Sequence, residues 1–184
     1  RELLARREFR LFLIAAGLAQ AAHATFFTFG TIIWQKQGLS AAWCGTLWAI
    51  GVFAEVLLFT FSGRVAAKFG AARLIAIAGL ASIVRWLTLA SDPSLAILVP
   101  LQLLHGVTYG ASHIGAMHFI HDAVPRDRAA SAQALYATVS AGVAMGVATL
   151  IAGYFYAEAG PLSYVAMAVI AAVSLGAAVR LMQT

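Results

Sequence analysis

Six apolar runs follow one another along this chain, and each is long enough to cross a lipid bilayer. Of the 184 residues, 62% are hydrophobic and only 10% are charged. A membrane-spanning helix needs about 20 mostly apolar residues, whereas a barrel strand needs about ten residues of alternating polarity. The runs do not alternate, so they predict helices. We expect an all-α membrane protein, a single six-transmembrane-helix bundle over residues 1–184, with spans at residues 11–34, 41–62, 72–90, 95–120, 129–155 and 162–179.

The Lys and Arg residues predict the orientation of this bundle. Ten of the twelve flank the runs on one side, whereas Lys36 alone lies on the other side and Arg85 lies inside a run. Positive charge concentrates on the cytoplasmic side of membrane proteins. Both termini and the loop of residues 63–73 are therefore expected in the cytoplasm, and the protein in a bacterial inner membrane. The ten residues are Arg1, Arg6, Arg7, Arg10, Arg64, Lys68, Arg73, Arg126, Arg128 and Arg180.

Several classes of function are not supported by the pattern of residues. The basic residues are divided among loops beside apolar runs, so the net charge of +5 does not indicate a nucleic-acid partner. No Ser-His-Asp pattern, glycine-rich phosphate loop or paired-cysteine motif is present, so neither an enzyme nor a cofactor is expected. The single Cys44 excludes an internal disulfide. The start of the chain does not resemble a signal peptide, and because it begins at Arg1 we expect a preceding segment.

One group of residues has the spacing of a metal site. His118, His121 and Asp122 lie at positions i, i+3 and i+4, which would place three ligands on one helical turn. They fall at the end of a run, where polar residues are ordinary. No metal site is therefore predicted.

Two ionisable residues, Glu55 and Arg85, lie in the middle of apolar runs. An ionisable group at membrane depth costs about 3 kcal/mol or more, so it usually faces a partner or a water-filled path. Counted along the helix from the cytoplasmic ends, Glu55 lies about 12 Å and Arg85 about 18 Å into the membrane. A long Arg side chain can bridge that offset if the helices are neighbours. A proton-binding carboxyl and a static ion pair both remain open.

The fourth run carries a polar stripe. Gln102, His105, Tyr109 and Ser112 follow spacings of three, four and three, so they share one helix face, and His113 borders it. Such a stripe indicates a hydrated pathway, although a buried histidine can also simply hydrogen-bond a neighbour. His23 lies at mid-depth of the first run, three residues after Gln20. We expect proton coupling by Glu55, Arg85 and His105, and substrate binding by His23, Arg85, Gln102, His105 and Tyr109.

Small residues at four-residue spacing predict close packing between helices. Gly106 and Gly110 form such a pair on the fourth run. Thr138, Gly142 and Gly146 form a longer stripe on the fifth run. Stripes of this kind let helix backbones approach one another, so both are expected to face another helix.

Six segments spread over the chain carry a specific combination of residues. They read QAAHATFFTFGTIIW (20–34), LWAIGVFAEVLLF (47–59), VRW (84–86), LQLLH (101–105), SHIGAMHFI (112–120) and AQALY (132–136). This combination resembles the C-terminal half of the phenylpropionate-type permeases of the major facilitator superfamily. Gly63, Lys68, Gly70 and Arg73 also resemble that superfamily's loop motif, with Ala67 at the position that is usually acidic.

The resemblance implies one half of a major facilitator fold, with a second six-helix half as partner and substrate held between the halves. More distantly the chain resembles lactose permease. The buried Glu, Arg and His of that relative match Glu55, Arg85 and His105. Gln102 replaces a Lys, and Thr108 replaces the Glu that carries the proton there. Proton coupling would therefore fall to Glu55 or to the other half.

The sequence as a whole predicts the C-terminal half of a secondary transporter. We expect symport of protons with a small organic solute such as an aromatic carboxylate. A sugar or nucleoside proton symporter is an alternative, and so is a self-contained six-helix protein that acts as a homodimeric scaffold or channel. An intramembrane enzyme that uses the histidines is the least favoured class.

Overall fold

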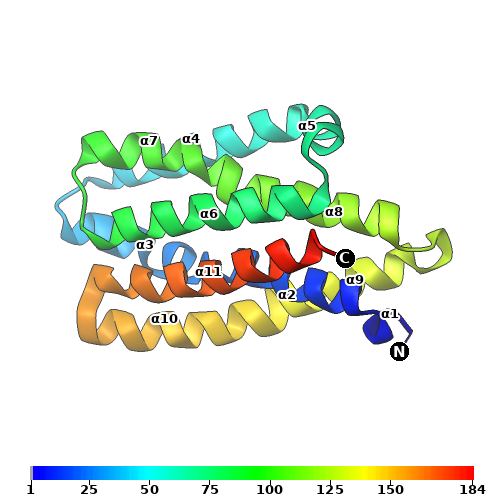
Figure 1. The fold of residues 1–184 in the computed structure, drawn as a ribbon. Coiled ribbons are helices and arrows are strands. Elements are labelled where there is room, and N and C mark those ends of the chain that lie inside the picture. Colours follow the sequence, from blue (N-terminus) through cyan, green and yellow to red (C-terminus); the bar gives the residue numbers. More distant parts are fainter. Residues whose placement is uncertain (1) are drawn as a thin grey trace.

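The computed structural model describes residues 2–184 and shows a bundle of long helices (Figure 1). These residues contain no strand, so the predicted all-α fold is confirmed. Five helical segments among them are long and apolar enough to cross a membrane: Arg7–Lys36, Ala41–Thr60, Ala71–Ala90, Leu95–Ala123 and Arg126–Leu181.

The last segment, Arg126–Leu181, contains two antiparallel arms. A straight helix of its 56 residues would be about 84 Å long, far beyond the thickness of a bilayer. It turns back at η4 (Gly160–Leu162), where Gly160 adopts a φ of +54° that residues with a Cβ rarely tolerate. The arms, α10 (Met145–Ala159) and α11 (Ser163–Leu181), lie side by side in Figure 1.

The first apolar run is not one continuous helix. A short α1 (Glu2–Ala5) leads into α2 (Arg7–Ala21), which is separated from α3 (Ala24–Lys36) by a turn at His23. The His23 N–H bonds Gln20 O at 3.1 Å rather than the carbonyl four residues back. That freed carbonyl, Ala19 O, instead lies 3.1 Å from the His23 ring Nδ1. Because a bilayer offers no water to an unpaired carbonyl, the histidine side chain makes the break tolerable.

The segment of residues 63–73, which the sequence predicted as a loop, is mostly helical. After α4 (Ala41–Thr60), the helix α5 (Ser62–Phe69) runs to Gly70, whose φ of +74° ends it before α6 (Ala71–Ala90). Arg64 and Lys68 lie one turn apart on its exposed face. The loop prediction was wrong because a short amphipathic helix has no long apolar run to reveal it.

Two of the remaining runs contain wider π-helical turns. In the fourth run, η1 (Gly106–Ala111) separates α7 from α8, and in the fifth, η3 (Thr138–Ala144) separates α9 from α10. π-turns of this kind are rare and frequently occur at functional sites. The flanking elements are α7 (Leu95–His105), α8 (Ser112–Ala123), the connecting turn η2 (Arg126–Arg128) and α9 (Ala129–Ala137).

The helices divide into an inner group and an outer group. The most extensive packing joins α6 to α11 and α11 to α2, where Ser174 Oγ donates to Ala15 O at 2.7 Å. On the outer side, α4 and α10 leave large apolar side chains uncovered, among them Phe53 (65% exposed) and Leu150 (77% exposed). Apolar side chains that point outward in this way are suited to contact lipid or another membrane domain.

The two ends of the bundle differ in charge. Both described ends of the chain, α5 and the connection between α8 and α9 lie at one end (Figure 1). We call this the basic end, because every Lys and Arg of residues 2–184 except Lys36 and Arg85 belongs to it. An ion pair there links Arg128 to Glu2, and the Arg128 guanidinium lowers the pKa of the Glu2 carboxyl.

The two glycine stripes differ in their surroundings. A Cβ on Gly106 would lie 2.7 Å from Ala54 O, and one on Gly110 would lie 3.1 Å from the Leu58 side chain, so the predicted close packing of the fourth run is confirmed. Gly142 and Gly146 have no such neighbour within 4 Å among the described residues. The prediction that this stripe of the fifth run faces another helix was therefore wrong for this chain. Residue spacing identifies a helix face with small side chains, but not which helix packs against it.

These glycines offer a matched pair of substitutions. We expect Gly106→Ala to lower the free energy of unfolding by about 1–3 kcal/mol, because the added methyl collides with a backbone carbonyl. Gly142→Ala adds the same methyl in open space and brings a similar gain in helix propensity, so we expect unchanged or higher stability. Thermal unfolding of both purified variants in detergent measures the difference. Equal stabilities would contradict the close approach of η1 to α4.

Candidate functional site

A buried guanidinium organises the polar centre of the bundle. Arg85 on α6 is fully buried, and its Nη1 donates to His105 Nδ1 at 3.0 Å and to Thr108 Oγ1 at 3.1 Å. Its Nη2 donates to Gln102 Oε1 at 3.1 Å. All three acceptors lie on α7 or η1, so one side chain ties α6 to the fourth run. No sequence pattern indicated Thr108 as a partner of the arginine.

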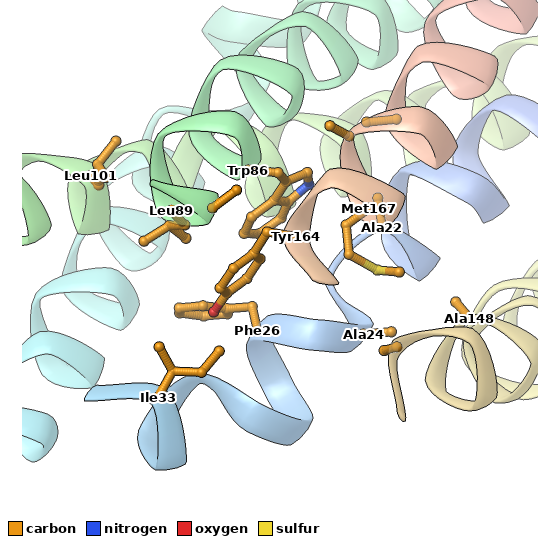
Figure 2. Packing of buried hydrophobic residues seen from close by; sticks show 14 of the residues in the cluster. Ala22, Ala24, Phe26, Ile33, Trp86, Leu89, Leu101, Ala148, Tyr164 and Met167 are labelled. Carbon is orange, nitrogen blue, oxygen red and sulfur yellow. The ribbon is translucent and has the colours of Figure 1, made fainter. Parts of the chain in front are cut away.

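Aromatic rings surround this guanidinium. Its Cζ lies 4.4 Å from the ring centroid of Phe26 and 4.8 Å from that of Trp86. Trp86 stacks in turn on Tyr164, with centroids 5.8 Å apart and an angle of 8° between the rings. Figure 2 shows these three aromatic side chains packed together. The negative faces of aromatic rings attract a cation, which helps to hold the charge away from water.

His105 lies between the arginine and the buried carboxylate. Its Nε2 lies 3.6 Å from Glu55 Oε2, while its Nδ1 faces Arg85. Glu55 and Arg85 form no direct ion pair in the described structure. The imidazole of His105 therefore lies between Glu55 and Arg85, the two residues for which the sequence had left a static ion pair open. The Glu55 side chain is 21% exposed and that of His105 is 6% exposed, so the carboxylate is the more accessible of the two.

The arginine fixes where the histidine carries its proton. A guanidinium can only donate hydrogen bonds, so the Nδ1 of His105 must accept. A neutral His105 then carries its proton on Nε2, which points this N–H at Glu55. A second proton on Nδ1 would break the bond to Arg85. This N–H faces the Glu55 carboxylate across 3.6 Å, a separation longer than a hydrogen bond, so the two groups interact electrostatically.

A second histidine completes the network. The His23 Nδ1 lies against the carbonyls of Ala19 and Gln20, so it must donate, and its Nε2 is left to accept from Thr108 Oγ1 at 3.2 Å. Thr108 also accepts from Arg85. Thr108 thereby links His23 to Arg85, and its hydroxyl proton has His23 Nε2 at 3.2 Å and His105 O at 3.4 Å as acceptors.

A hollow of about 320 Å³ opens beside this network, and we call it the solute hollow. Tyr109 of the predicted stripe lines it, and so does His113, which borders that stripe; of the two, only Tyr109 was predicted to bind substrate. Gln20, whose Nε2 donates to Ser112 Oγ at 2.9 Å, also lines it and was noted only as a neighbour of His23. The remaining lining residues are Phe27, Tyr136, Ala137, Ser140, Ala141 and Met145.

The other residues proposed for substrate binding lie behind this surface. His23, Arg85 and Gln102 are each fully buried, and His105 is 5% exposed. In this conformation a solute in the hollow can touch Tyr109, while Arg85 acts on it only through its charge and through His105. The sequence predicted that these residues lie in one region of the bundle. It could not show which side chains line the hollow and which are buried behind it.

The group with metal-ligand spacing lies at the basic end, away from the network. The candidate ligand atoms of His118, His121 and Asp122 lie within 4.8 Å of one another. The carboxylate is engaged by both histidines, at 3.3 Å from His118 Nε2 and 2.7 Å from His121 Nδ1. The His121 side chain is 81% exposed, so this group is open to solvent.

An apolar helical bundle built around a buried, hydrogen-bonded polar centre belongs to the class of integral membrane proteins. The sequence matches the model of the MFS_1 like family over residues 1–166, and the chain belongs to this family of the major facilitator superfamily. The resemblance stated from the sequence is thereby confirmed.

Individual relatives agree with the family. The chain is 33% identical to the "Probable 3-phenylpropionic acid transporter" of Escherichia coli over 168 residues, which cover 91% of this chain and 44% of the relative. It is 28% identical to the "Uncharacterized transporter YwbF" of Bacillus subtilis, over 85% of this chain and 39% of the relative. It is 32% identical to the "Maltose permease" of Geobacillus stearothermophilus, over 84% of this chain and 39% of the relative. The chain thus spans less than half the length of these relatives, and no solved structure matches it significantly.

Proposed function

We propose that this chain forms the C-terminal half of a secondary transporter that moves a small organic solute, such as an aromatic carboxylate, together with protons. The observation that carries the proposal is Glu55, a partly accessible carboxylate that lies 3.6 Å from His105 Nε2, next to the hydrogen-bond network of Arg85. A carboxylate at membrane depth that faces a water-accessible space can take up and release a proton. Relatives that are named as transporters or permeases support the transport class.

Glu55 is assigned the titrating role, and His105 the orienting role. The Nδ1 of His105 is occupied by Arg85, so this histidine keeps its proton on the side of Glu55. The charge of Glu55 can then change without the loss of any hydrogen bond to Arg85. This assignment replaces a three-residue proton site by one titrating carboxyl and two groups that position it.

The solute hollow supplies the wall for the solute. Its volume of about 320 Å³ lies at the small end of the range for ligand sites. Phe27, Tyr109 and Tyr136 offer aromatic surface to a ring, and the side-chain amide of Gln20 offers a donor to a carboxylate. The buried charge of Arg85 adds a positive potential behind this wall. We propose that a second six-helix half closes the open side of the hollow, with substrate between the halves.

A sugar is the second candidate solute. The similarity to a maltose permease favours it, and a lining of aromatic rings and amides suits hydroxyl groups as well. The two solutes differ in charge, so they can be distinguished by whether uptake requires an anion.

The proposed function is tested with the full-length transporter that contains this chain, reconstituted into vesicles that enclose a pH-sensitive dye. We expect external 3-phenylpropionate to enter as labelled solute and to acidify the interior faster than in protein-free vesicles, which report passive entry of the acid. Maltose entry with acidification would select the sugar alternative. Solute entry at the protein-free rate for both compounds would refute the proposal.

The orientation in the membrane is also a proposal, and it predicts the labelling pattern of α5. We expect a cysteine that replaces Lys68, in a Cys44→Ala background, to react with an impermeant reagent only from the cytoplasmic side of an inner membrane. The physical reason is that the basic end carries all but one of the described loop and terminal cations. Labelling of residue 68 from the outside of intact cells would reverse the topology.

A further inference from the structure

Two hollows meet at the side chain of His113. The solute hollow lies on one side, and a second hollow of about 400 Å³ lies on the other, between α4, α5 and α8. This second hollow extends toward the basic end, where His118 lines it. His113 lines both hollows, so its side chain is shared by the two.

Rings descend from the buried network to this junction one helical turn at a time. The His105 and Tyr109 centroids are 5.5 Å apart with an angle of 21°, and those of Tyr109 and His113 are 6.4 Å apart with an angle of 4°. On α4 the same descent runs from Glu55 to Phe59, whose ring lies 5.9 Å from that of His113. These ring separations exceed a hydrogen bond, so a proton that moves between His105, Tyr109 and His113 requires water between them, and Phe59 only packs beside this path.

The surroundings of His113 leave its nitrogens free to exchange protons. The ring is half-buried, and within residues 2–184 neither nitrogen forms a hydrogen bond. Groups near it that can titrate are Tyr109 one turn away, Tyr136 across the solute hollow and His118 across the second hollow, while Glu55 lies one turn from Phe59. An imidazole that is unengaged in this way has one nitrogen that can accept a hydrogen bond and one that can donate.

We infer that His113 relays protons between Glu55 and the basic end of the bundle, with His118 and Asp122 at the exit. This inference rests on the proposed function, because it requires Glu55 to exchange protons. One nitrogen of the ring accepts a proton while the other releases one, which leaves the opposite neutral tautomer. A flip of the ring, or exchange of its proton with water, restores the first tautomer before the next passage. The 3.3 Å contact between His118 Nε2 and Asp122 Oδ2 provides the next acceptors outward.

The test compares two modes of transport by the full-length protein in vesicles with an enclosed pH dye. For His113→Gln we expect solute exchange within about two-fold of wild type, and solute-driven acidification slowed about 100-fold or more, the range of a lost acid–base group. His121→Gln is the matched control, because His121 lies on the same helix but is exposed outside both hollows. We expect it to leave both rates unchanged.

The outcomes separate this inference from the proposed function. If wild type moves solute without acidification, the proposed function fails. If wild type acidifies and His113→Gln acidifies at the same rate, the relay is overturned while the proposed function stands. Should His113→Gln also lose exchange, His113→Asn is measured in the same way. Loss of exchange in both variants would assign His113 a structural role and overturn the relay.

Discussion

Glu55→Gln is expected to abolish proton-driven accumulation in the full-length transporter while solute exchange across the membrane continues. Glutamine keeps the shape of the carboxylate and still faces the His105 N–H, but it cannot release a proton. We expect accumulation to fall about 100-fold or more, as for loss of an acid–base group, and the pH dependence of uptake to flatten. Accumulation and exchange of labelled solute in vesicles measure the two modes.

The control for this change is Glu158→Gln, which removes an exposed carboxylate at the far end of α10. It should leave both modes unchanged. Failure of both modes in Glu55→Gln, together with poor folding, would mean that the carboxylate only holds helices together. Accumulation with unchanged pH dependence would mean that Glu55 carries no proton.

Arg85→Lys is expected to reduce accumulation and exchange together, by about 100-fold, equivalent to a loss of about 2.7 kcal/mol. Two nitrogens of the planar Arg85 guanidinium donate to three acceptors, and a lysine ammonium cannot reproduce that arrangement. Each acceptor left unsatisfied costs about 1–3 kcal/mol, so we also expect a lower melting temperature. Arg85→Lys therefore differs from Glu55→Gln, because it is expected to reduce solute exchange as well as accumulation.

Arg180→Lys is the matched control for the arginine, because Arg180 is exposed in the last turn of α11. It should behave as wild type in uptake and in thermal unfolding. An Arg85→Lys protein with uptake within about three-fold of wild type would show that charge alone is required there, and that the hydrogen-bond pattern is not.

The sequence predicted the all-α fold because uncharged runs of bilayer length leave the backbone no other way to satisfy its hydrogen bonds. It did not predict the interruptions within those runs. The break at His23 depends on a side chain that bonds a backbone carbonyl, and hydropathy does not register such a bond. The helix α5 was missed for a related reason. It has only eight residues, and an amphipathic pattern of that length is too short to be identified from hydropathy.

For the candidate site, helical spacing located the stripe of Gln102, His105 and Tyr109 but not its partners. The depths of Glu55 and Arg85 suggested a direct contact, and the structure instead places His105 between them. Which neighbouring helix a polar face meets is a tertiary property, so periodicity alone could not decide it. The same limit explains why Tyr136, quoted only for its resemblance to a family segment, was not expected in the solute hollow.

Because the fourth run contains the π-turn η1, its number of residues determines the direction in which the side chains after the turn point. A π-turn holds one residue more than an α-turn, so deletion of one residue between Gly106 and Ala111 is absorbed by conversion to an α-turn, whereas deletion of two residues rotates everything that follows by about 100° about the helix axis. His113 would then leave the junction of the two hollows, although no chemical group had been removed. Alignments and chimaeras of this family member therefore need to preserve residue count across this turn to within one residue, even where the residues themselves are exchanged.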